Sequence, residues 1–131
     1  MKRLVIILFS LFFVQSATAS QGKDLNQTMK NMGHAYKQAM EATEAHEINK
    51  HLDTMLSLLK QSEQHNFKTD VKTESLQGLQ KVADVIEQAQ NLLTHKQIHQ
   101  AKQRLKEVDL LRKEYHKLHE PPGFWELLFG K

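Results

Sequence analysis

The stretch LQGLQKVADVIEQAQNLL, residues 76–93, decides the fold. Its apolar side chains recur at intervals of three and four residues, the spacing that lines them up along one side of an α-helix. Charged and amide side chains fill most positions in between. The pattern predicts a long amphipathic helix, ending near Thr94, that buries a single stripe. The stripe consists of Leu76, Leu79, Val82, Ile86, Ala89 and Leu93.

Three further segments show the same spacing. The first helix is expected from about residue 24 to 41 with Asp24 as its N-cap, and the second from an N-cap at Thr43 to about Ser62. The last is expected to start around His95 or Lys96 and to stop before the prolines at 121 and 122. The three predicted stripes are Leu25, Met29, Met32, Tyr36 and Met40; Ile48, Leu52, Met55, Leu56 and Leu59; and Ile98, Ala101, Leu105, Val108, Leu111 and Tyr115.

Strand-like alternation of polar and apolar residues is missing, and the connections between the four segments are short. The loosest is 64–70, which is polar apart from Phe67 and offers Thr69, Asp70 or Thr73 to cap the third helix. Short connections make consecutive helices antiparallel neighbours. The sequence therefore predicts an all-α fold, an antiparallel up-down-up-down four-helix bundle within residues 20–120.

Both ends of the chain are expected to lie outside the bundle. Residues 1–19 have the three parts of a secretory signal peptide: the basic pair Lys2 and Arg3, a short apolar run, and the small residues 17–19 before the expected cleavage. This predicts an exported protein, periplasmic if the source is a Gram-negative bacterium. Residues 121–131 form an aromatic C-terminal tail, GFWELLFGK after the prolines, which either folds back over the bundle end or contacts a partner.

Composition excludes several classes of function. The chain has no cysteine, which excludes disulfides, thiolate metal sites and haem attached through thioether bonds. Without Lys2 and Arg3, 16 of the 18 basic residues remain against 15 acidic ones. A charge so close to zero gives no electrostatic case for binding nucleic acid.

The predicted topology brings one thioether and one imidazole to the same level. The start of the first helix and the end of the fourth lie at the same end of such a bundle, and Met29 and His116 each lie between one and two turns inside it. This pair of side chains can hold a six-coordinate haem iron. Purely structural roles are also open, because methionine often fills cores and histidine is often favourable at a helix C-terminus. His119 falls further round the helix, toward solvent.

Two stretches carry a family resemblance. DLNQTMKNM, residues 24–32, and RKEYHKLH, residues 112–119, resemble the soluble cytochrome b562 family. The resemblance runs from about Lys23 to His119 and implies a four-helix bundle that binds haem b noncovalently. It implies Met29 and His116 as the axial ligands, with Arg112 and Tyr115 matching the family residues just before the histidine. It also implies electron transfer with a redox partner protein and no catalytic residue, because the protein fills both axial positions.

Three positions depart from the family pattern. Family members carry aromatic residues against the haem on the third helix and a basic residue after the last histidine, whereas this chain has Ser75, Leu79 and Glu120. The alternative function is therefore a haem-free helical interaction protein, or a metal-buffering or stress protein, that keeps the bundle. His95 and His99 have the i, i+4 spacing of a two-histidine metal site on the fourth helix, although a solvated polar face explains them better.

Overall fold

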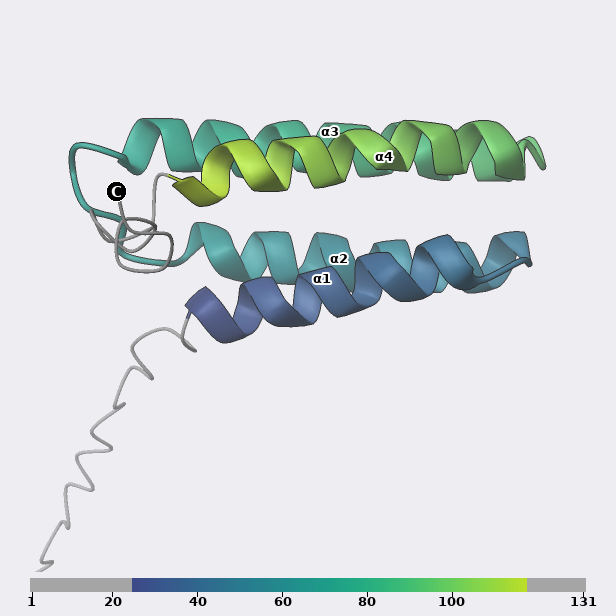
Figure 1. Cartoon of the computed structure of the whole chain (residues 1–131), viewed down its shortest axis with the longest axis horizontal. Helices are drawn as coiled ribbons and strands as arrows, with labels where there is room; N and C mark the ends of the chain where they lie inside the picture. Colours follow the sequence, from purple (N-terminus) through teal and green to yellow (C-terminus); the bar gives the residue numbers. More distant parts are fainter. Residues whose placement is uncertain (1–24, 118–131) are drawn as a thin grey trace, which may run out of the picture.

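The computed structural model describes residues 25–117, and these form four helices in sequence (Figure 1). They are α1 (Leu25–Glu41), α2 (Ala45–Glu63), α3 (Lys72–Thr94) and α4 (Ile98–His116). The predicted signal peptide, the tail and the proposed N-cap Asp24 lie outside the described residues. Three short connections, 42–44, 64–71 and 95–97, reverse the chain each time. The predicted all-α, up-down-up-down four-helix bundle is confirmed.

The helices pack mainly as two pairs. Figure 1 shows α1 beside α2 and α3 beside α4, and the pairs are joined chiefly through the contact of α2 with α3. The backbones of the first and last helices, by contrast, approach each other less closely than those within either pair. The start of α1, the 64–71 loop and the end of α4 share one end of the bundle, on the left in Figure 1. We call this the open end and the opposite one, which holds the 42–44 and 95–97 turns, the closed end.

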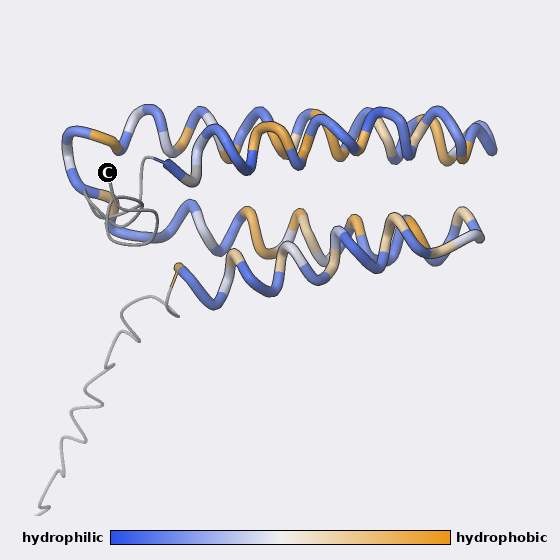
Figure 2. The backbone as a smooth tube through the Cα atoms, in the orientation of Figure 1, coloured by the Kyte–Doolittle hydropathy of each residue, from blue (hydrophilic) through white to orange (hydrophobic). Residues whose placement is uncertain are grey.

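Apolar residues recur along each helix in Figure 2, as an amphipathic bundle requires. The most deeply buried side chains of α1, α3 and α4 lie toward the closed end. Full burial of each large aliphatic side chain contributes about 1.5–3 kcal/mol. Residues with no exposed surface are Ala39, Ile48, Leu52, Met55, Ile86, Ala89, Ala101 and Leu105.

The stripe predicted for α1 is partly wrong. Its most buried residues are Thr28, Met32, Ala35 and Ala39. Four of the five predicted residues, Leu25, Met29, Tyr36 and Met40, are only half-buried and pack against the edge of the core. The small side chains of Ala35 and Ala39 lie deepest because α1 packs closely against α2.

The side-chain caps predicted for α2 and α3 are also wrong. The residue before α2 is Glu44 rather than Thr43, and the residue before α3 is Val71. Neither makes a side-chain capping hydrogen bond. Both instead accept the first helical hydrogen bond through the backbone carbonyl, from the N–H of Ile48 at 3.0 Å and of Ser75 at 2.9 Å.

The turn between α3 and α4 separates His95 from His99. His95 is the residue that ends α3, and the chain reverses through Lys96, whose φ is 58°. The ring of His95 bonds through Nδ1 to the Asn91 carbonyl at 2.9 Å. Because α4 begins only at Ile98, the two histidines do not share a helix, and the predicted i, i+4 pair is wrong.

Candidate functional site

The half-buried flank of α1 faces α4. Near the closed end, the Lys102 ammonium of α4 donates to the carbonyls of Met40 and Ala42, the first at 3.0 Å. Further along, burial raises the pKa of the Tyr36 phenol, the negative charge of Asp109 raises this pKa further, and the positive charge of Arg112 opposes the change. Tyr36 of α1 and Asp109 of α4 are therefore close enough for the carboxylate charge to act on the phenol.

This register sets Met29 opposite position 116. Met29 precedes Tyr36 by seven residues, and position 116 follows Asp109 by seven. In antiparallel helices both steps lead about 10 Å toward the same end. Seven residues also make nearly two complete turns, so each step stays on the same flank of its helix. The two positions thus lie at the same level of the bundle, while the His116 side chain lies outside the described part of the structure.

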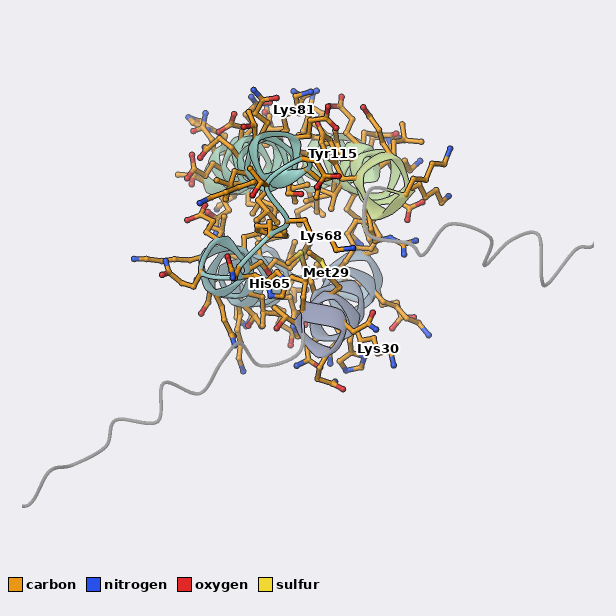
Figure 3. The ribbon with its side chains drawn as sticks, turned by 90° about the vertical axis from the view of Figure 1, so that its left-hand side faces the viewer. Met29, Lys30, His65, Lys68, Lys81 and Tyr115 are labelled. Atoms are coloured by element: carbon orange, nitrogen blue, oxygen red, sulfur yellow. The ribbon has the colours of Figure 1, made fainter. Side chains whose placement is uncertain are left out.

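Met29 is one of several half-buried apolar residues at the open end. Figure 3 looks onto this end and shows Met29 near the middle, between the two helix pairs. Leu25, Leu76 and Leu111, from α1, α3 and α4, are likewise half-buried against the edge of the core. Met32, one turn along, is only 8% exposed and belongs to the core, as expected for a filling residue. A thioether beside half-buried leucines suits a flat apolar macrocycle that brings its own iron.

Arg112 lies on the surface of α4. Its guanidinium donates from Nη2 and Nε to the Asp109 carboxylate, at 2.9 and 3.2 Å, and the Lys113 ammonium lies 2.8 Å from the other carboxylate oxygen. The two bonds from Lys113 and Arg112 lower the pKa of Asp109. Arg112 is therefore held by this carboxylate beside the flank that faces α1.

Tyr115 packs between α4 and α3. Its ring lies so close to the backbone of Gly78 that a methyl group there would come within 2.4 Å of it. The Lys81 ammonium lies over the ring, 5.5 Å from its centre, and Figure 3 shows both residues on the side of the bundle away from α1. Tyr115 thus fixes the last turns of α4, which include position 116, against α3.

The two α3 positions that depart from the family pattern face inward. Ser75 and Leu79 are 3% and 7% exposed, and the Ser75 hydroxyl donates to the Val71 carbonyl at 2.6 Å. An aromatic ring nevertheless reaches this end of the core from the 64–71 loop, where Phe67 is 6% exposed. The His65 ring packs edge-on to it at 5.0 Å. No role was predicted for Phe67, although a single aromatic residue in a polar loop indicates that its side chain is buried.

Within 25–117, no three His, Cys, Asp or Glu side chains gather into a metal-binding group. Over the same part of the chain, no helix has the length and apolar character needed to cross a bilayer.

Comparison with known families agrees with the fold and with this geometry. Antiparallel four-helix bundles with a potential ligand on the first and last helices form a class of small haem carriers. The chain belongs to the cytochrome b562 family, whose sequence model matches residues 24–120. Membership implies haem binding and electron transfer, and the family consists of electron carriers rather than enzymes. Curated protein sequences give no significant match to the chain.

Proposed function

We propose that this protein is a periplasmic electron carrier that holds one noncovalent haem b between α1 and α4, with Met29 and His116 as axial ligands. The observation that carries the proposal is the register of these two helices, in which the Lys102 ammonium bonds to the carbonyls of Met40 and Ala42 near the closed end. The effect of Asp109 on the pKa of Tyr36 agrees with this register. Continued toward the open end, the register supports Met29 and position 116 as a pair at the same level.

Each residue has a defined part in this function. The Met29 thioether is a soft, neutral donor that favours ferrous iron and would raise the reduction potential above that of a site with two histidines. The bound haem supplies reversible one-electron chemistry, and two protein ligands leave no position for oxygen or substrate. Tyr115 braces the His116 turn of α4 against α3, and Arg112 contributes positive charge beside the α4 flank. The bound haem would exchange single electrons with a redox partner protein.

Visible spectra of matched methionine variants test the ligand assignment. The purified protein, reconstituted with haemin, should give the sharp reduced bands of a low-spin b-type centre. Met29→Leu should abolish the methionine-ligated spectrum, while Met32→Leu should keep it, because Met32 belongs to the core and leucine has a similar volume. His116→Ala should also lose the low-spin bands. A low-spin spectrum that survives Met29→Leu would assign the sulphur ligand to another residue.

The predicted export requires its own test. The family match begins at residue 24, after the proposed signal peptide at 1–19. Expression of the full chain in a Gram-negative host should deliver a periplasmic protein that begins at Ser20, and mass spectrometry of the osmotic-shock fraction measures this start. An uncleaved protein in the cytoplasmic fraction would contradict the proposed location.

A further inference from the structure

The loop between α2 and α3 lies at the open end of the bundle and is held by its own hydrogen bonds. Turn hydrogen bonds run from the N–H of His65 to the Ser62 carbonyl at 3.0 Å and from the N–H of Val71 to the Lys68 carbonyl at 3.1 Å. The Phe67 side chain is buried in the core cluster and anchors the middle of the loop. A loop held at three points positions the residue next to the anchor.

That residue, Lys68, lies over the end of the site. Figure 3 places it near the centre of the end face, between the two helix pairs and in the region of Met29. Its side chain is exposed. None of the ion pairs found among residues 25–117 involves Lys68; they join Lys37 to Glu41, Arg104 to Glu107, and Asp109 to Arg112 and Lys113. The Lys68 ammonium is thus available to an anion arriving at the open end.

The neighbouring Lys30 offers a direct contrast. It follows Met29 in the sequence, is also exposed, and carries the same charge. Figure 3 shows it pointing outward from α1, away from the middle of the bundle. Lys30 is next to Met29 in the sequence but points away from the proposed site, whereas Lys68 is placed at the site by the loop (Figure 3).

We infer that Lys68 binds a carboxylate of the cofactor, pairing its ammonium with a haem propionate at the open end. This inference rests on the proposed haem site between α1 and α4. Haem b carries two propionates, and a macrocycle held by Met29 near this end has to leave them in water or give them cationic partners. Lys68 supplies such a partner from a loop that Phe67 already holds in place.

Titration of the apoprotein with haemin and with haemin dimethyl ester, at low ionic strength, tests the pairing. Lys68→Gln should weaken haemin binding by about two- to five-fold, the range expected of an exposed ion pair. Lys30→Gln, the matched control, should bind haemin like the wild type. With the dimethyl ester, which has no charged propionates, wild type and Lys68→Gln should bind equally. The thermal stability of both apo variants should stay at the wild-type value, because neither lysine is buried.

The outcomes separate this inference from the proposed function. A wild-type protein that forms no low-spin complex with haemin would refute the haem site itself and the role of Lys68 with it. A normal low-spin complex whose affinity is equal in Lys68→Gln and Lys30→Gln would refute the role of Lys68 alone. Equal weakening of haemin and of its ester in Lys68→Gln would also refute it, because the loss would then not depend on the propionate charge.

Discussion

The two ends of the bundle differ in how tightly they are packed. Toward the closed end, the small residues Ala39, Ala89 and Ala101 are completely buried, as are the large side chains of Leu52 and Leu105. At the open end, large apolar residues of α1, α3 and α4 are only half-buried. These residues are Leu25, Met29, Leu76 and Leu111.

The difference separates the residues that fold the protein from those that bind the ligand. The closed end holds more residues that are completely buried, although Met40, Leu92 and Ile98 there are only half-buried. The open end keeps apolar surface on Met29 and Leu111 that a ligand could cover. Binding of a ligand to the native state alone would add its free energy to the stability of the fold.

Truncation of a closed-end leucine should have the largest effect. Leu52→Ala removes a completely buried side chain, and such substitutions cost about 2–5 kcal/mol of unfolding free energy. Met29→Ala in the apoprotein should cost less, about 1 kcal/mol, because the side chain is only partly buried. Urea denaturation followed by circular dichroism measures both. Equal costs would show that the two ends are packed alike.

Haem should stabilise the open end selectively. At a free haemin concentration of about 100 times the dissociation constant, binding adds about 2.7 kcal/mol to the free energy of unfolding. Amide hydrogen exchange should show new protection in the first turns of α1 and the last turns of α4, with little change around the 95–97 turn. His116→Ala should remove both effects. Protection spread evenly along α1 and α4 would contradict a haem bound at one end.

The sequence predicted the architecture because long apolar stripes and short connections leave few ways to fold. It also predicted the level of Met29 and His116, because both lie close to helix ends whose positions follow from the topology. Helix boundaries proved less predictable. His95 looked like part of α4, yet it ends α3, since the reversal through Lys96 uses backbone hydrogen bonds that no side-chain pattern announces.

Sequence patterns did not identify the residues whose role depends on their position in the folded structure. The charge of Asp109 reaches Tyr36 from a different helix, and its effect depends on the rotation of α1 about its axis. The predicted stripe placed Met29 and Tyr36 toward the core centre, whereas Thr28 and Ala35 occupy that place. Lys68 lies in a polar loop, where only the burial of its neighbour Phe67 distinguishes it from other exposed lysines.

Alanine substitution of two helical glycines compares an open position, Gly33, with one that faces the Tyr115 ring, Gly78. Gly33→Ala in α1 should raise the unfolding free energy by up to about 1 kcal/mol, since alanine favours helix and the added methyl meets no atom within 4 Å. Gly78→Ala in α3 gains the same helix preference but displaces the Tyr115 ring. Overpacking typically costs about 1–3 kcal/mol, so a net loss of about 1 kcal/mol is expected by thermal denaturation. Stabilisation by both would show that Tyr115 does not hold α4 to α3.

The smallest expected effect is the loss of the ion pairs that Asp109 makes within α4. Bonds from Lys113 and Arg112 lower the pKa of Asp109 below its ordinary value of 3.8, so these bonds stabilise the fold above that pH and lose their effect as the pH falls through the lowered pKa. Asp109→Asn should therefore cost about 0.5 kcal/mol at neutral pH, as expected of surface ion pairs. The difference from wild type should vanish in acid. Urea denaturation at several pH values measures it.

The same substitution should change a tyrosine on the other helix. Without the negative charge of Asp109, the pKa of Tyr36 should fall toward its ordinary value of 10.0. Absorbance titration near 295 nm follows the phenolate, and Tyr115→Phe in both proteins leaves Tyr36 as the single tyrosine that titrates. Lys37→Gln, which removes a charge from α1 outside this contact, serves as the control. A Tyr36 pKa that ignores Asp109 would mean a different register, and Met29 would then no longer lie opposite position 116.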